Sequence, residues 1–314
     1  MHPAFSIIFF TTAAGAGYGL LGLVGILAPL NVLPDGGWFG IVALAVGVLL
    51  VVVGLLSSVL HLGHPERAWR AVSQWRSSWL AREGIASILT FAPIALLGIA
   101  WGLLGSTGPV TWVGGVATAL GCIATVYCTA MIYRSLKPIH QWHNAWVVPN
   151  YLALALMTGA VLLNALLHLF GDGNAAIGAA TMALIGLSVL VKEGYWGFIS
   201  RVPAKSSPET ATGLGRIGKV RFLEAPHTEA NYLLKEMGFK VGRKHSARLR
   251  MISRVLGFGL PLVATLLAIF VPAVAAPATV IAVAGTAVGI IVERWLFFAE
   301  ARHAVQLYYG AQTV

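Results

Sequence analysis

The chain has 314 residues, of which 58% are hydrophobic and only 10% are charged. Soluble proteins carry about 25% charged residues, so this composition excludes a soluble domain and predicts an integral membrane protein. The net charge of +10 would suggest a nucleic-acid partner for a soluble protein. In a membrane protein it fits orientation in the bilayer and contact with anionic lipid headgroups, so we expect membrane lipids and no nucleic acid as partners.

Eight apolar runs are long enough to cross a bilayer, because about 20 helical residues at about 1.5 Å each span about 30 Å of hydrocarbon. The runs are continuous rather than alternating, which favours helices over a β-barrel. We therefore predict an all-α, polytopic membrane protein that forms a single membrane domain over residues 1–314. The predicted spans are 6–29, 38–61, 84–104, 110–133, 149–170, 175–199, 255–273 and 278–300.

The first run is expected to be mature structure rather than a signal peptide, because it lacks a basic leading region and seven more spans follow. Its stretch Gly17–Gly22 formally matches the dinucleotide fingerprint G-x-G-x-x-G. That fingerprint needs a preceding strand and an exposed helix start, which a membrane span does not offer. Close packing of helices through small residues is the better explanation.

The connections between the runs are alternately basic and almost uncharged. All 21 Lys and Arg residues fall near one face, mostly in 63–83, 134–148 and 200–254, whereas the opposite connections hold only Asp35 and Asp172 as charges. Loops rich in Lys and Arg stay in the cytoplasm. We therefore predict a bacterial inner membrane protein with both termini in the cytoplasm. The basic face either orients the protein only or also docks a soluble partner, and the two roles can coexist.

The turn between the second and third spans holds the densest group of ionisable and aromatic residues. His61 closes one span and Glu83 opens the next, so both are expected at the same depth. A His can bind a quinone carbonyl and change protonation near neutral pH, and a carboxylate can pass protons to water. We predict a quinone site at His61 and Glu83; the alternative is that they only cap helix ends. Further candidate pocket residues in this turn are His64, Trp75, Arg76 and Trp79.

Metal centres find little support in the sequence. Cys122 and Cys128 lie in one span and cannot supply the four thiolates of an iron–sulfur cluster. A haem b would need two His residues from different helices, and His61 with His140 or His143 is the pairing to consider. Interfacial histidines explain these residues better, so we predict no metal site, and neither iron–sulfur cluster nor molybdenum, in this protein.

Charged residues also lie inside the sixth and eighth spans, as Lys192-Glu193 and Glu293-Arg294. Pairing, or reaching up to the basic face, would account for them, and a proton path along the bundle is the alternative. Between these spans and the seventh lies the hydrophilic segment 200–254, which includes a predicted amphipathic helix at Thr228–Gly238.

Several stretches resemble the DMSO reductase anchor-subunit family, which is more distantly related to polysulfide reductase membrane subunits. The resemblance covers essentially the whole sequence. It implies an eight-helix subunit whose partners, a molybdopterin catalytic subunit and a four-cluster ferredoxin-like iron–sulfur subunit, dock on the basic face. It also implies that His61 and Glu83 bind menaquinol, usually without haem. The stretches are Met1–Thr12, His61–Trp69, Trp79–Glu83, Met131–Pro138, Trp142–Asn144 and Glu293–His303.

Within that family, Phe222–Phe239 is most similar to the membrane subunit of the cytoplasm-facing sulfite dehydrogenase. The resemblance thus implies a subunit that takes no part in the molybdenum reaction but carries the quinone site, with quinone reduced as sulfite is oxidised. The alternative is a DMSO reductase anchor that oxidises menaquinol; either ubiquinone or menaquinone fits. Two other classes remain open, a transporter with a midplane site on broken helices and a purely structural anchor.

Overall fold

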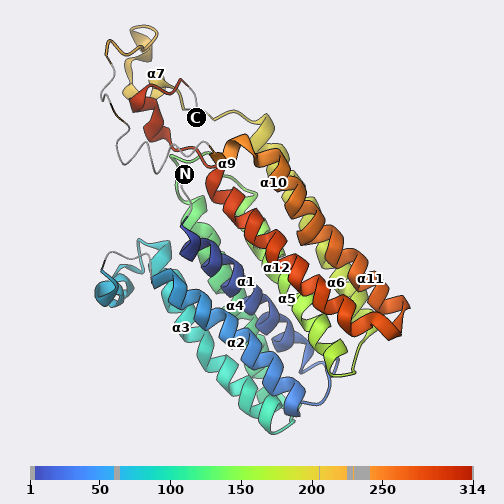
Figure 1. Cartoon of the computed structure of the whole chain (residues 1–314). Coiled ribbons are helices and arrows are strands. Elements are labelled where there is room, and N and C mark those ends of the chain that lie inside the picture. The colour runs from blue at the N-terminus through green and yellow to red at the C-terminus, as the bar shows by residue number, and fades with distance from the viewer. Residues whose placement is uncertain (1–3, 60–63, 205, 225–228, 230–240, 313–314) are drawn as a thin grey trace.

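The computed structural model describes residues 4–59, 64–204, 206–224, 229 and 241–312. Within them, eight helices are long and apolar enough to cross a membrane. They run side by side as one bundle, and the two ends of the described chain lie at the same end of it (Figure 1). This confirms the predicted all-α, eight-span architecture. The helices are α1 (Phe5–Leu27), α2 (Gly37–Val59), α3 (Trp79–Leu97, continued to Leu103), α4 (Pro109–Arg134), α5 (Val147–Leu169), α6 (Ala175–Arg201), the α10–η4–α11 helix (Ser246–Phe270) and α12 (Ala275–Ala299).

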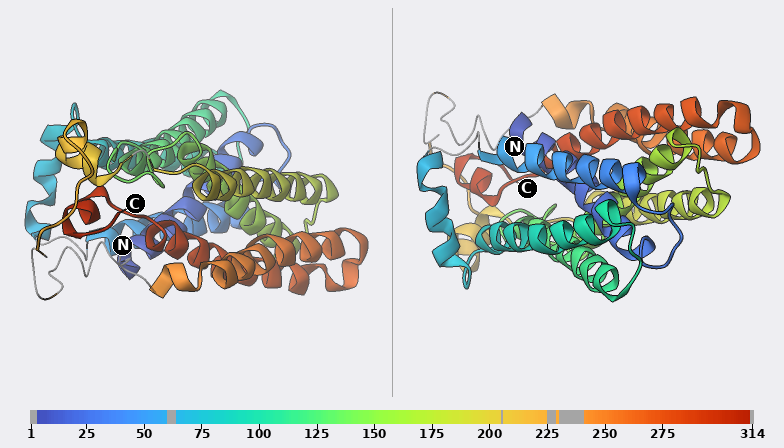
Figure 2. Two further views of the ribbon diagram at one scale, coloured as in Figure 1. Left: turned by 90° about the horizontal axis from the view of Figure 1, so that it is seen from above. Right: turned by 90° about the horizontal axis from the view of Figure 1, so that it is seen from below.

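The helices form two groups that meet along α1. Helix α1 packs against α2 and α4 in the first group and against α5 and α12 in the second, while α6 and α11 complete the second group. Figure 2 shows α1 and α2 lying between α3 and α4 on one side and α11 and α12 on the other. Any space between α1, α4, α5 and α12 therefore lies at the junction of the two groups.

Glycines allow α1 to approach its neighbours at backbone distance. A Cβ added to Gly19 would lie 1.8 Å from the Ala155 carbonyl oxygen of α5, and one added to Gly17 would lie 2.7 Å from the Gly47 carbonyl oxygen of α2. Such contacts are typical of membrane helices that associate through small residues. The predicted packing role of the glycines in the first span is confirmed at these two positions.

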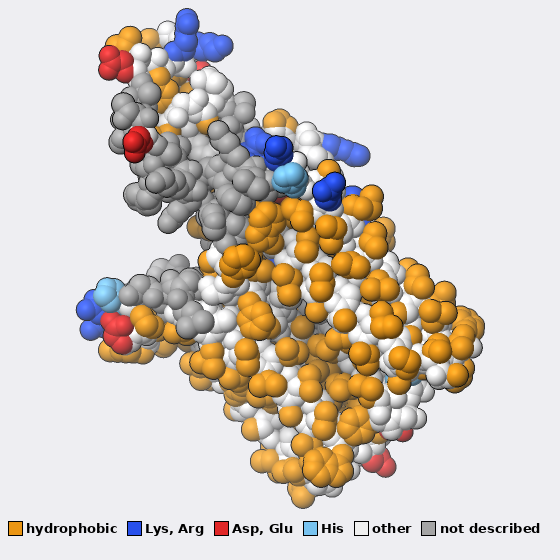
Figure 3. Space-filling view, in the orientation of Figure 1, with side chains coloured by type: hydrophobic (Ala, Val, Ile, Leu, Met, Phe, Trp, Pro, Cys, Tyr) orange, Lys and Arg blue, Asp and Glu red, His pale blue; other side chains and the backbone are white. Residues whose placement is uncertain are grey.

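Short elements gather at the end of the bundle that carries most Lys and Arg residues, which we call the basic face. They include α7 (Pro208–Thr212), η3 (Leu214–Arg216), α9 (Val241–Lys244) and η6 (Ala304–Tyr309), and η1 (Pro65–Gln74) projects sideways there (Figure 1). Figure 3 shows the Lys and Arg side chains at this end, with an acidic cluster at the far end. The predicted helix Thr228–Gly238 falls outside the described residues, apart from Glu229.

Candidate functional site

Glu83 lies on the second turn of α3 with only 4% of its surface exposed. The helix begins at Trp79 rather than at the predicted position 84, because the Ser78 hydroxyl caps it by accepting a hydrogen bond from the Ala81 amide (3.4 Å). Glu83 is thereby drawn one turn inside the bundle. Its carboxylate oxygen Oε1 accepts a hydrogen bond from the Thr129 hydroxyl of α4.

Thr129 can pass its single hydroxyl proton between two acceptors. Its Oγ1 lies within hydrogen-bond reach of Glu83 Oε1 and also 3.1 Å from the Thr125 carbonyl oxygen. An ionised Glu83 can only accept, so it takes the Thr129 proton. A protonated Glu83 can donate to Thr129, which then donates to Thr125. The arrangement therefore satisfies Glu83 in both protonation states.

The other predicted site residues lie at the surface or outside the described part of the protein. His61 falls outside the described residues. His64 is exposed and contacts Glu66 (3.1 Å), and Trp75 is 50% exposed with the Arg76 guanidinium 5.2 Å from its ring centroid. Their part in a quinone pocket stays a prediction.

Trp79 takes an intermediate position between that surface group and Glu83. It is half-buried on the first turn of α3, where its ring meets Tyr127 of α4 edge to face at 5.9 Å. The Arg82 guanidinium lies 4.2 Å from the Trp79 ring centroid. Trp79 therefore covers the α3–α4 contact at which Glu83 and Thr129 meet.

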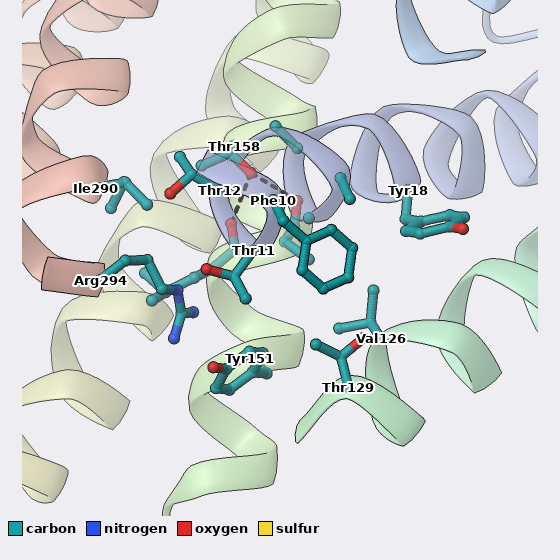
Figure 4. Close-up of a pocket in the computed structure, with 15 residues that line it drawn as sticks. Phe10, Thr11, Thr12, Tyr18, Val126, Thr129, Tyr151, Thr158, Ile290 and Arg294 are labelled. Carbon is teal, nitrogen blue, oxygen red and sulfur yellow. Dashed lines mark hydrogen bonds between the residues drawn. The ribbon is translucent and has the colours of Figure 1, made fainter. Parts of the chain in front are cut away.

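A polar cavity opens beside Thr129, between α1, α4, α5 and α12 (Figure 4). Its volume of about 20 Å³ is enough for about one water molecule. In Figure 4 the Phe10 ring projects from α1 toward Val126 and Thr129. The labelled lining residues are Phe10, Thr11, Thr12 and Tyr18 of α1, Val126 and Thr129 of α4, Tyr151 and Thr158 of α5, and Ile290 and Arg294 of α12.

Arg294 brings a buried cation to this cavity. It is 3% exposed, and its guanidinium carbon lies 3.9 Å from the centroid of the Tyr151 ring. Its Nε lies 3.4 Å from Glu293 Oε2, but its Nη1 atom has no hydrogen-bond partner among the described residues. Leaving a buried polar group without a partner costs free energy. An oxygen atom in the cavity would meet that need.

Behind Arg294, the charges of two helices are linked. Lys192 of α6 forms an ion pair through Nζ with Glu293 Oε1, and both side chains are fully buried. Glu193 instead pairs with Arg254 through two hydrogen bonds of 2.6 and 2.7 Å. The predicted pairing of these residues is confirmed. Sequence analysis missed that Arg294 faces a cavity, although its place two turns inside a span was the available signal.

An apolar groove adjoins the polar cavity and shares Thr12, Ala16, Thr158 and Ile290 with it. Its volume is about 210 Å³. Two of its residues, Phe9 and Ile291, are 43% and 41% exposed, so the groove opens on the outer surface of the bundle. Its remaining lining residues are Ala13, Leu50, Val161, Leu162, Val283, Thr286 and Ala287.

Residues 1–300 match the family model for the DMSO reductase anchor subunit (DmsC). The protein belongs to this family. It is 35% identical to the C subunit of sulfite dehydrogenase from Allochromatium vinosum, over 98% of this protein and 99% of that one. Two proteins of Escherichia coli anaerobic dimethyl sulfoxide reductases match over shorter regions. YnfH is 30% identical over 38% of this protein and 42% of its own length, and the protein designated C is 28% identical over 40% and 44%.

Family membership confirms the resemblance inferred from the sequence motifs, and with it the assignment of the protein as a multi-pass membrane anchor subunit. The full-length relative bears the name of a sulfite dehydrogenase, whereas the relatives named for DMSO reductase match less than half of the sequence. Within the described residues, no group of three or more His, Cys, Asp or Glu side chains is placed to hold a metal ion.

Proposed function

We propose that this protein is the membrane anchor and quinone-reactive subunit of a three-subunit molybdopterin and iron–sulfur oxidoreductase. The observation that carries the proposal is the buried Glu83 carboxylate, whose partner Thr129 lines a polar cavity inside the bundle. Each ionisable group inside a membrane costs about 2.5–3.5 kcal/mol on insertion scales, so a functional role is the default explanation.

The chemistry asks for a group that holds and releases protons. Two-electron reduction of a quinone takes up two protons, and oxidation of a quinol releases two. Glu83 is stabilised in either protonation state by Thr129, so it is suited to general acid–base transfer. It also stands one turn from the basic-face end of α3, which shortens the way to water.

His61 completes the proposed proton-transfer pair on the strength of the family resemblance. Helix α2 ends at Val59 and α3 begins at Trp79, and both ends lie at the basic-face end of the bundle. In this proposal His61 and Glu83 serve the two sides of one quinone-binding region. His64, Trp75, Arg76 and Trp79 form its outer rim toward the basic face.

Sulfite oxidation with quinone reduction is the reaction we propose for the whole complex. The similarity to a sulfite dehydrogenase subunit over 98% of the sequence supports it. Electrons would pass from the molybdenum subunit through a ferredoxin-like iron–sulfur subunit docked on the basic face, which the excess of Lys and Arg places in the cytoplasm of a bacterial cell. A DMSO reductase anchor that oxidises menaquinol is the second candidate, supported by the two partial relatives.

The test is purification of the intact complex through a tag on this protein, with identification of its subunits and of the quinone-coupled reaction. Glu83→Gln is expected to reduce turnover with quinone at least tenfold and to leave sulfite oxidation with an artificial electron acceptor unchanged. Glu66→Gln is the matched control, because that carboxylate is exposed on η1. Full quinone turnover in both Glu83→Gln and His61→Ala would contradict the site and leave a structural anchor.

A further inference from the structure

The proposed role of Glu83 leaves the opposite wall of the polar cavity unused. Arg294 stands on that wall, nearly fully buried, with Nη1 lacking a hydrogen-bond partner in the part of the protein that the structure describes. An Arg side chain stays protonated in proteins. The cavity therefore has a permanent cationic donor on one side and the Thr129–Glu83 pair on the other (Figure 4).

The charges behind Arg294 keep that wall positive. Lys192, Glu293 and Arg294 comprise two cations and one carboxylate, so the three side chains sum to one positive charge. Glu293 directs one oxygen to Lys192 and the other to Arg294 Nε, which fixes the guanidinium and leaves Nη1 facing the cavity. A ligand oxygen with high electron density would be bound there and would be favoured further as negative charge develops on it.

The apolar groove identifies the class of ligand. It is continuous with the cavity through Thr12, Ala16, Thr158 and Ile290, and it opens where Phe9 and Ile291 are exposed. A molecule that fills both spaces has a polar head and a long apolar tail, and it reaches the site from the lipid. Neither a soluble anion nor a water molecule would need the groove.

We propose that Arg294 binds one carbonyl oxygen of an isoprenoid quinone whose head occupies the polar cavity and whose tail lies in the groove between α1, α2, α5 and α12. This inference rests on the proposed function, in which Thr129 and Glu83 serve the other oxygen. The Phe10 ring must turn aside to admit the head, because the cavity with that ring in place holds only about one water molecule.

The first test addresses the head of the ligand. A hydrogen bond to a charged group contributes enough that Arg294→Gln should raise the KM for quinone about 10- to 100-fold. The same variant should lose most of the quinone that co-purifies with the complex, measured by extraction and chromatography. Arg254→Gln is the control, because Arg254 makes a half-exposed pair with Glu193. Wild-type KM and quinone content in Arg294→Gln would overturn the assignment.

The second test addresses the tail. Ala287 lies in the groove and is exposed, so Ala287→Trp should block the tail; Ala284→Trp is the control on the same helix, exposed and outside the groove lining. Ala287→Trp should lower turnover and photolabelling with a long-tailed quinone at least tenfold and spare a tailless analogue. Equal loss with both quinones, or with neither, would overturn the tail assignment.

These tests separate the two proposals. If the wild-type complex neither binds nor reduces quinone, the proposed function fails. If the wild-type complex does both, and Arg294→Gln and Ala287→Trp behave like their controls, the proposed function stands and the inference about Arg294 and the groove fails.

Discussion

At the scale of the residue, the Thr129 hydroxyl is the group that joins a buried carboxylate to the cavity. Removing it while keeping the shape of the side chain should isolate that contribution. We predict that Thr129→Val lowers quinone-coupled turnover roughly 10- to 100-fold, because Glu83 loses a hydrogen bond to a charged group. Thr129→Ser keeps the hydroxyl and should retain most of the activity. Steady-state turnover of the purified complex with quinone measures both.

An outcome in which Thr129→Val and Thr129→Ser are equally active would show that the hydroxyl plays no part in proton transfer. Equal loss in both variants, with sulfite oxidation through an artificial acceptor also lost, would instead point to damaged packing between α3 and α4.

The ion pairs of Lys192 and Arg254 offer a second contrast between single residues. Lys192→Met leaves the fully buried Glu293 with Arg294 alone, and breaking a buried pair costs up to about 3–5 kcal/mol. Arg254→Met breaks a pair whose side chains are about two-fifths exposed, where the cost is about 0–1 kcal/mol. We predict a large fall in the thermal midpoint of unfolding for the first variant and a small one for the second.

Thermal unfolding followed by intrinsic fluorescence in detergent measures this contrast. Restoring charge balance by adding Glu293→Gln to Lys192→Met should recover part of the lost midpoint, because no carboxylate is then left without its partner. Similar midpoints for Lys192→Met and Arg254→Met would contradict the structural account.

Residue pairing shows how far the sequence carries the argument at this scale. The position of charges inside two spans predicted that they pair, but not that Lys192 chooses Glu293 over its own neighbour Glu193. Neighbouring residues in a helix point about 100° apart, so only one of Lys192 and Glu193 can face α12. Which one does so depends on the rotation of α6 in the bundle, and that follows from packing along its whole length.

At the scale of the element, the junction of the two helix groups depends on the crossing of α1 and α5. A Cβ on Gly19 would lie 1.8 Å from a backbone oxygen, and backbone cannot move aside as a flexible side chain does. We predict that Gly19→Ala destabilises the protein by about 1–3 kcal/mol or more, as overpacking does. Gly197→Ala on α6 meets nothing within 4 Å and should be neutral or slightly stabilising.

The yield of assembled complex and its thermal midpoint, compared between the two glycine variants, test this crossing. A Gly19→Ala protein as stable as wild type would mean that α1 and α5 do not approach at backbone distance. Since the polar cavity lies between these same helices, such a result would also undermine its geometry.

Helix boundaries were predicted less well than helix number. The seventh span was placed at 255–273, yet the helix begins at Ser246, because charged residues lower hydropathy without breaking a helix. Arg250 and Arg254 continue the helix and pair with Glu300 and Glu193. The start of α3 was missed for a similar reason, since the Ser78 cap precedes residues that hydropathy counts as loop. Apolar length thus locates a span, and caps and cross-helix pairs decide where its helix ends.

At the scale of the whole molecule, the basic face has two explanations that a single experiment can separate. Orientation alone requires only that cations stay on one side. Docking requires a surface with shape and apolar contacts, and the segment after α7 offers one. Ile217 is 86% exposed and Leu223 is fully exposed, and the cations Arg216, Lys219 and Arg221 alternate with them.

We therefore predict that neutralising these three cations to Gln weakens retention of the iron–sulfur subunit while the protein still inserts with wild-type orientation. The net charge falls from +10 to +7, which leaves the bias of Lys and Arg toward that side intact. Co-purification of the partner over a salt series measures retention, and a reporter fused to the C-terminus measures orientation. Asp35→Asn with Asp172→Asn, at the far end, is the control. If the neutralised variant retains its partner at every salt concentration, this part of the basic face serves orientation alone, and docking must depend on other residues of that face.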